Sequence, residues 1–295
     1  AAAHRRKAQV TQQLREGIEG LFRQQKVDLI RGTGTILAPG QVEVEGKTYS
    51  ADKILIATGS VPARPPIPGL EHALTSDELL EHQEQVFKSL VIIGGGVIGM
   101  EFASLYQMLG CQVTVLEAMD RILPNMDREV CQNLSMILKK RGVQIFAGAR
   151  VEQVEKAEEG YTVRFTQKGQ SAQVQGEVVL CAIGRRPNTQ GLFGPDFSVE
   201  QERGRILVDE NFQTSVPGVY AVGDVSARIQ LAHVASAQGT ACVERLAGRN
   251  PLTDLNAVPS CIYTDPEIAC VGLTADEAKA AGRAVKVGKY VMFSN

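Results

Sequence analysis

Three glycines in the order G-x-G-x-x-G, at Gly94, Gly96 and Gly99, offer the clearest chemistry in this sequence. They follow an apolar run typical of a buried strand and open a segment whose residues favour a helix. The first glycine permits a tight turn, the second lets a pyrophosphate approach the backbone, and the third lets the helix pack closely. The pattern predicts that a pyrophosphate lies at the positive end of the helix. An ordinary glycine-rich turn is the alternative.

An acidic residue, Glu117, ends the next apolar run after these glycines. A carboxylate at this place accepts hydrogen bonds from a ribose 2′-hydroxyl and repels a 2′-phosphate, which favours NAD over NADP. Strand, glycine turn, helix, strand and acid follow one another within about thirty residues, which is the dinucleotide-binding fingerprint. The whole series makes the ordinary turn the weaker interpretation.

The composition is that of a globular protein of ordinary charge. The 295 residues predict about two domains, with 44% hydrophobic and 22% charged residues. The formal net charge of −2 gives no indication of nucleic acid or an anionic membrane as a partner. No apolar run approaches the roughly 20 residues that span a bilayer.

Cysteine usage favours a reducing, cytoplasmic setting. The six cysteines are Cys111, Cys131, Cys181, Cys242, Cys261 and Cys270, and none forms a C-x-x-C or C-x-x-x-x-C pair. We expect small buried thiols rather than disulfides. With four scattered histidines, we expect no metal site.

Apolar periodicity predicts alternating helices and strands. Helices are expected over 7–25, 97–109, 127–141 and 233–246, with a capping box of Thr274 and Glu277 starting a short one. In the first helix one face carries Val10, Leu14, Ile18, Leu21 and Phe22. Strands are expected at 27–30, 41–44, 47–49, 53–57, 112–117, 143–146, 151–155, 161–165, 174–181, 218–222, 260–263, 268–271 and 285–293, and a linker at 61–68. A βαβαβ unit with a three-stranded antiparallel appendage over 151–181 makes one complete nucleotide-binding domain.

Further motifs accompany the glycine turn in a fixed order. They are Gly32-Thr33-Gly34, Ala57-Thr58-Gly59-Ser60, Ile183-Gly184-Arg185-Arg186-Pro187-Asn188, Tyr220-Ala221-Val222-Gly223-Asp224, Leu231-Ala232-His233 and the segment 259–272. On these motifs the chain resembles the FAD-dependent pyridine nucleotide–disulfide oxidoreductases, above all those that oxidise dihydrolipoamide. The resemblance implies an α/β fold: two Rossmann-like three-layer nucleotide-binding domains with antiparallel β-meanders, and the start of an α+β interface domain. It implies an FAD-binding domain over 1–80 and 186–258, an NAD-binding domain over 81–185, and a truncated dimerisation domain over 259–295.

The resemblance also assigns cofactor contacts. For NAD these are Gly94, Gly95, Gly96, Val97, Ile98, Gly99, Met100, Glu101, Glu117, Val151 and Gly184, with Glu101 in a supporting place near the nicotinamide. For FAD they are Gly34, Thr58, Gly59, Ser60, Asp224, Gln230, Leu231, Ala232 and His233, with Asp224 on the ribityl chain. Plain alternatives exist: Asp224 as a turn residue, His233 as a helix-start residue, and Arg185 with Arg186 as a solvated basic turn.

The implied activity passes electrons from dihydrolipoamide through a redox disulfide and FAD to NAD⁺. The implied partners are a second copy of the chain and a lipoyl carrier protein or 2-oxoacid dehydrogenase complex. The family's own FAD-binding glycine motif, its C-x-x-x-x-C pair and its C-terminal His–Glu pair have no match in this sequence. We therefore expect an incomplete chain that holds no catalytic residue and is inactive alone.

Two alternatives stay open. One is another NAD-linked flavoprotein reductase, of the mercuric reductase or soluble transhydrogenase type. The other is a catalytically silent nucleotide-binding fragment. Glutathione reductase is disfavoured because it uses NADP, which requires basic residues for the 2′-phosphate at the position that Glu117 occupies here.

Overall fold

The computed structural model describes residues 2–81, 87–255 and 257–291. The chain divides into two compact units, one formed by 1–61, 80–85 and 185–253 and the other by 62–79, 86–184 and 254–295. Each unit is described by itself. Among the described helices, none combines the length and the apolar character needed to cross a membrane.

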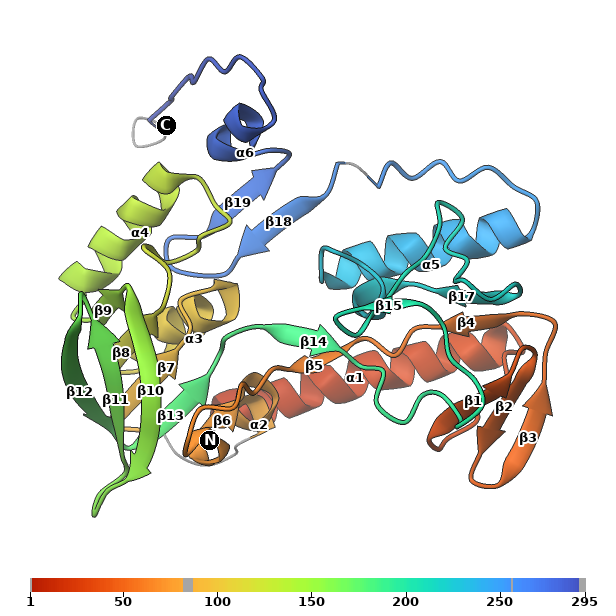
Figure 1. Ribbon diagram of the computed structural model, residues 1–295, viewed down its shortest axis with the longest axis horizontal. Coiled ribbons are helices and arrows are strands. Elements are labelled where there is room, and N and C mark those ends of the chain that lie inside the picture. The colour runs from red at the N-terminus through yellow and green to blue at the C-terminus, as the bar shows by residue number, and fades with distance from the viewer. Residues whose placement is uncertain (1, 82–86, 256, 292–295) are drawn as a thin grey trace. The chain divides into compact units, whose positions relative to one another are not determined.

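The second unit is built on a five-stranded parallel sheet (Figure 1). In spatial order its strands are β6 (Leu74–Thr75), β13 (Val178–Cys181), β7 (Ser89–Ile93), β8 (Gln112–Glu117) and β9 (Gln144–Ala147). From β7 the chain steps outward through β8 and β9, and then returns to β13 on the other side of β7. The strand order therefore reverses at β7, and open α/β sheets bind ligands at the carboxyl ends of the strands beside such a point.

Both faces of this sheet are covered, so β7 is apolar at nearly every position. Leu90 and Ile92 pack with Met100 of α3 (Val97–Met108) and Leu134 of α4 (Arg128–Lys140). Val91 and its neighbours on the opposite face pack against an antiparallel sheet. The result is three layers, of helix, parallel sheet and antiparallel sheet.

The antiparallel layer consists of β10 (Ala149–Lys156), β11 (Tyr161–Gln167) and β12 (Gln170–Gly176). The prediction of one strand over 174–181 is wrong, because the chain leaves this layer at Gly176 and enters the parallel sheet as β13. A Cβ on Gly176 would lie 2.8 Å from Val91 Cγ2, so the crossing point is tightly packed. Next to it, the backbone N–H of Glu177 donates to Ser89 Oγ at 3.0 Å, which ties the crossing to the start of β7.

The last part of the second unit is a hairpin of β18 (Pro259–Ile262) and β19 (Ile268–Val271), followed by α6 (Ala275–Ala280). The predicted capping box of Thr274 and Glu277 is confirmed. The predicted strand over 285–293 is wrong for 285–291, which form no strand, and 292–295 lie outside the described residues. The same unit also holds η1 (Leu70–His72), and α2 (Ser76–Glu81) follows β6.

The first unit contains several small sheets around one core. Its elements are α1 (Ala2–Gln24), β1 (Gly34–Ala38), β2 (Gln41–Val44), β3 (Lys47–Ser50), β4 (Ile54–Ile56), β5 (Ser60–Pro62), β14 (Arg185–Pro187), β15 (Gln201–Glu202), β16 (Arg205–Ile206), β17 (Val219–Ala221), η2 (Gly223–Val225) and α5 (Ala232–Leu246). Strands β4 and β17 pair in parallel although they are far apart in sequence. Ile36, Ile56 and Val219 lie in the core. Strand β5 overlaps the start of the stretch over 61–68 that was predicted to be a linker.

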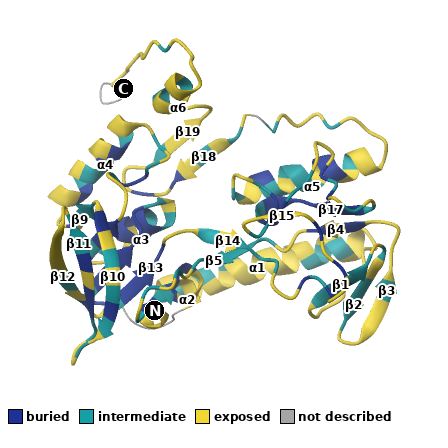
Figure 2. Ribbon diagram, viewed as in Figure 1, coloured by how far each residue is buried: buried dark blue, intermediate teal, exposed yellow. Residues whose placement is uncertain are grey.

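For the N-terminal residues, the predicted helix is confirmed and the predicted strand is wrong. Helix α1 forms, but it contains no buried residue, and Leu14, Ile18 and Leu21 are 64%, 53% and 58% exposed (Figure 2). Residues 27–30 form no strand. The spacing of apolar residues predicts that a helix has an apolar face, but it does not determine whether another element packs against that face and buries it.

All six cysteines are free thiols, four of them buried, while Cys261 and Cys270 are exposed, unlike the expected buried thiols. Burial raises the pKa of the Cys111 thiol to about 11. An unfolded chain would lose this proton near pH 9 while the folded chain keeps it, so folding is disfavoured as pH rises between these values.

We therefore expect the free energy of unfolding to fall by about 2 to 3 kcal/mol from pH 9 to pH 11 through Cys111 alone. Urea unfolding over this range, compared between the protein and a Cys111→Ala variant, measures the effect. The variant should show the shallower pH dependence, and parallel curves would contradict the assignment.

Candidate nucleotide-binding sites

The turn after β7 has the geometry that its glycines predict. Gly94 has a φ of +112°, and a Cβ there would lie 2.4 Å from the carbonyl oxygen of Ala182. A Cβ on Gly99 would lie 2.0 Å from the carbonyl oxygen of Gly94. Since both distances are far below van der Waals contact, these two glycines are required by the fold itself.

The middle glycine differs in a way that points to a ligand. A Cβ on Gly96 would meet no atom within 4 Å, and its φ of −73° suits any residue. The same residue is the N-cap of α3, and no side chain of the described residues caps this helix start. Uncapped N–H groups facing open space beside a glycine form a cradle for a phosphate, so the residues present fit a dinucleotide.

Glu117 lies beside this turn at the end of β8. Its Oε2 accepts from the Gly95 N–H at 2.5 Å and its Oε1 accepts from the Met119 N–H at 2.7 Å. The residue is only 7% exposed. Two backbone donors therefore hold the carboxylate in place, and its remaining lone pairs can accept from a hydroxyl group. The sequence placed Glu117 at the ribose but gave no indication that it also fixes the turn.

The other predicted NAD residues differ in how far their side chains are exposed. Gly184 follows β13 with a φ of +122°, and its carbonyl accepts from the Ala63 N–H at 2.9 Å. Val151 lies in β10, half-buried. Met100 is fully buried in the core, so its side chain faces away from any ligand. Val97 is 36% exposed at the start of α3, next to Ile98.

Glu101 has a partner within the second unit. Its Oε1 accepts from the Tyr263 N–H at 2.9 Å, which links α3 to the end of β18. The carboxylate therefore ties the C-terminal hairpin to α3, and it is also a candidate neighbour of the nicotinamide. The sequence suggested only the second role.

In the first unit, three predicted or neighbouring residues meet around Asp224, which lies in η2 after β17. Ser60 Oγ donates to Asp224 Oδ2 at 2.7 Å. Arg185 donates through Nε to Ser60 Oγ at 2.8 Å and through Nη2 to the Ser60 carbonyl at 2.7 Å. Asp224 Oδ1 makes no hydrogen bond to another described residue, so it can accept from a sugar or polyol hydroxyl, as the ribityl assignment requires.

The turn of Thr58 and Gly59 is fixed by Asn188. Thr58 Oγ1 donates to the Asn188 carbonyl at 2.7 Å, and the Asn188 N–H donates to the Gly59 carbonyl at 2.9 Å. Gly34 begins β1, where a Cβ would be in ordinary contact with Val42 at 3.5 Å. Gly34 is therefore not required by the fold in the described residues.

The start of α5 lies against η2. The Gly223 N–H donates to Gln238 Oε1 at 2.8 Å, and a Cβ on Gly223 would lie 3.0 Å from Ala235 Cβ. Leu231 is the N-cap of α5 and supplies no side-chain cap, with Gln230 before it and Ala232 and His233 in the first turn. An uncapped helix start beside Asp224 fits an electron-rich group such as a reduced flavin ring.

Arg185 is a candidate site residue that was not singled out from the sequence. It was weighed as part of a solvated basic turn, yet its guanidinium binds Ser60, which is 125 positions away. No local sequence pattern could have predicted this contact, because the residues around Ser60 and around Arg185 carry no information about which distant residue each one contacts. Among the described residues, no group of three His, Cys, Asp or Glu side chains could hold a metal ion.

Comparisons with known proteins agree with this geometry. The family model described as pyridine nucleotide-disulphide oxidoreductase matches residues 1–239. The chain belongs to this family. The model of the family's dimerisation domain matches residues 258–295. Members of the family use FAD and a pyridine nucleotide, and both candidate sites of this family member are consistent with those cofactors.

Among curated relatives, the dihydrolipoyl dehydrogenase of Bacillus subtilis is 41% identical over 305 residues, covering 97% of this chain and 64% of that protein. That of Thermus scotoductus is 41% identical over 287 residues, covering 95% of this chain and 62% of that protein. The chain thus spans less than two thirds of the length of these relatives. A solved flavoprotein disulfide reductase, RclA from Escherichia coli, is similar with a TM-score of 0.84 and 30% identity, over 95% of this chain and 65% of that chain.

Proposed function

We propose that this chain is the nucleotide-binding part of an NAD-dependent dihydrolipoyl dehydrogenase. The observation that carries the proposal is the cradle at Gly96 beside Glu117, in a chain 41% identical to dihydrolipoyl dehydrogenases over nearly its whole length. Relatives at 30% identity, such as the reductase RclA, support the flavoprotein fold but are more distant in sequence.

In this proposal the second unit holds NAD over the carboxyl ends of β7, β8 and β13. The α3 start receives the pyrophosphate, Glu117 accepts from the adenosine ribose, and Gly184 and Val151 border the dinucleotide, with Glu101 on the nicotinamide side. The Glu117 carboxylate is already oriented by two backbone donors, so little ordering is needed on binding.

The first unit would hold FAD through Gly34, the Thr58-Gly59-Ser60 turn, Asp224 and the α5 start from Gln230 to His233. When bound there, FAD would supply two-electron redox chemistry between the dithiol and the nicotinamide. The chain's own part is to hold the ribityl hydroxyls at Asp224, whose position Ser60 and Arg185 fix. Partial positive charge at the uncapped α5 start would stabilise negative charge on the reduced ring.

The proposed partners are a second copy of the chain and a lipoyl carrier of a 2-oxoacid dehydrogenase complex, in the cytoplasm. The dithiol chemistry itself would come from a redox cysteine pair that this sequence does not contain. We infer that the 295-residue chain binds NAD but does not catalyse dithiol oxidation by itself.

The test uses purified protein with dihydrolipoamide and NAD⁺, followed by NADH absorbance and the visible flavin spectrum. We expect NAD binding but no turnover from the 295 residues alone, and turnover from a polypeptide that also carries the family's redox cysteine pair and C-terminal His–Glu pair. If dihydrolipoamide is not oxidised, two other activities would favour the alternative enzymes. Reduction of mercuric ion would favour a mercuric reductase, and hydride exchange between NADPH and NAD⁺ would favour a soluble transhydrogenase. Turnover by the 295-residue chain would refute the inactive-chain part of the proposal.

A further inference from the structure

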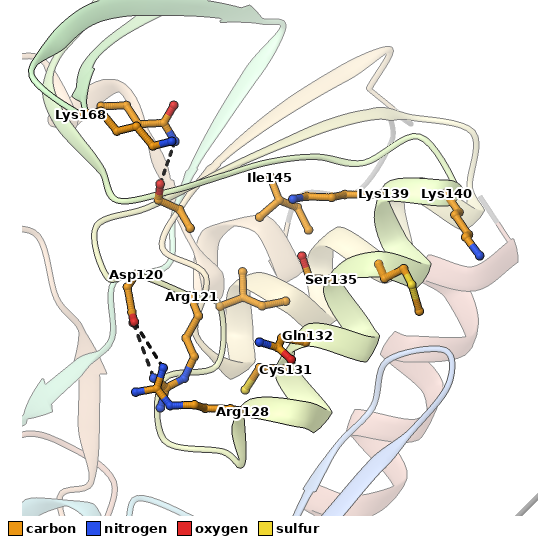
Figure 3. Close-up of a pocket in the computed structure, with 14 residues that line it drawn as sticks. Asp120, Arg121, Arg128, Cys131, Gln132, Ser135, Lys139, Lys140, Ile145 and Lys168 are labelled. Atoms are coloured by element: carbon orange, nitrogen blue, oxygen red, sulfur yellow. Dashed lines mark hydrogen bonds and ion pairs between the residues drawn. The ribbon is translucent and has the colours of Figure 1, made fainter. Parts of the chain in front are cut away.

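A pocket of about 910 Å³ lies in the second unit beside α4, the loop after β8 and the edge strand β9 (Figure 3). This volume falls within the roughly 300 to 1,000 Å³ of small-molecule sites. The pocket shares no lining residue with the NAD or FAD contacts proposed above. Its charged lining is strongly basic, with five cations against one acid: Arg121, Arg128, Lys139, Lys140 and Lys168 against Asp120.

The arginine end of the pocket is largely neutralised. Arg128 Nε pairs with Asp276 Oδ2 at 2.9 Å, and Arg121 Nη1 lies 3.6 Å from Asp120 Oδ1. The Nε of Arg121 is nevertheless buried without a hydrogen-bond partner among the described residues. Buried donors are normally hydrogen-bonded, so a water molecule or an anion is expected to accept a hydrogen bond from this N–H group.

The lysine end is not neutralised. Lys139, Lys140 and Lys168 make no ion pair with any acidic side chain in the described part of the chain. Figure 3 shows the Lys139 side chain extending from α4 toward Ile145, while that of Lys140 points away from it. The helix dipole favours lysines in the last turn of α4, but it does not account for Lys168, which comes from the turn after β11.

We propose that this pocket binds a small phosphate-bearing anion. Lysine ammonium groups act as point charges for phosphate, and Lys139 and Lys168 approach the pocket from two different elements. Ile145 and Met136 provide an apolar wall for the organic body of the ligand. The charge, the apolar wall and the buried Arg121 donor together fit a phosphate ester better than a neutral molecule.

The glycine turn is close enough that it must be separated in the experiment. A Cβ on Gly95 would lie 3.1 Å from Ile122 Cγ2, and Ile122 also lines the pocket. Pyrophosphate could therefore occupy the α3 start instead. Calorimetric titration of the protein with inorganic pyrophosphate, with and without saturating NAD, distinguishes the two places.

We expect pyrophosphate binding that persists in saturating NAD and weakens roughly tenfold or more in a Lys139→Gln, Lys168→Gln double variant. A Lys156→Gln variant is the control. The pocket residue Gln167 pairs with Ala149 at one end of β10, whereas Lys156 lies at the other end of this strand, where it pairs with Tyr161. The control removes a positive charge away from the pocket and should bind as the unmodified protein does. All three lysines are on the surface, so thermal melting should confirm that the variants fold.

Three results would overturn the proposal. One is the absence of pyrophosphate binding in the presence of NAD. Another is displacement of pyrophosphate by NAD, which would place the anion at the glycine turn. The third is equal weakening per removed charge in the control and in the double variant, which would show a diffuse effect of net charge only.

Discussion

A Gly96→Ala variant is expected to fold as stably as the unmodified protein and to bind NAD about 10- to 100-fold more weakly. The added methyl group meets no atom within 4 Å and the backbone φ of −73° suits alanine, so folding loses nothing. The same methyl group would occupy the place where a pyrophosphate approaches α3, and overpacking of this kind costs about 1 to 3 kcal/mol. Thermal melting and calorimetric titration with NAD measure the two effects separately.

Gly99→Ala is the matched comparison at the same turn. Its methyl group would lie 2.0 Å from the Gly94 carbonyl oxygen, so α3 must move away from β7. We expect this variant to have a lower melting temperature and a weaker affinity for NAD than the unmodified protein. If Gly96→Ala keeps full NAD affinity, no phosphate lies against Gly96 and the proposed cofactor site is wrong.

Replacing Glu117 by arginine should reverse the choice between the two dinucleotides. The variant loses the carboxylate that would accept from the ribose and gains a phosphate partner. We expect NAD to bind at least about tenfold more weakly, since hydrogen bonds to charged groups are worth about 1.5 to 3 kcal/mol. NADP should bind more tightly than it does to the unmodified protein, as titration with each nucleotide would show.

The structure adds a second effect of this change. Glu117 also accepts from the N–H groups of Gly95 and Met119, and these donors would be left without their buried acceptor. A Glu117→Gln control keeps one acceptor oxygen and removes the charge, so it should weaken NAD less and admit NADP less. Unchanged NAD affinity in the arginine variant would show that Glu117 does not contact the ribose.

Local patterns in the sequence predicted much of the second unit because the relevant interactions are short in range. The alternation of apolar strand and amphipathic helix predicted β7, α3, β8, α4 and β9, and the capping box of Thr274 and Glu277 forms as expected. The predicted strand over 174–181 failed because its first residues belong to β12 and its last residues to β13, and these two strands lie in different sheets. Sheet membership depends on partners distant in sequence, which local periodicity does not report.

The sequence by itself determined the glycine turn. Gly94 and Gly99 are dictated by steric contact within one strand, turn and helix, and Glu117 follows at the spacing that the βαβ unit requires. Tertiary structure alone decided what those residues contact. It brought the Glu117 carboxylate onto the Gly95 N–H, joined Arg185 to Ser60, and left the α1 face exposed. It also gathered lysines from α4 and from the turn after β11 around one pocket. Such contacts depend on how the chain folds back on itself, so residue spacing alone could not have predicted them.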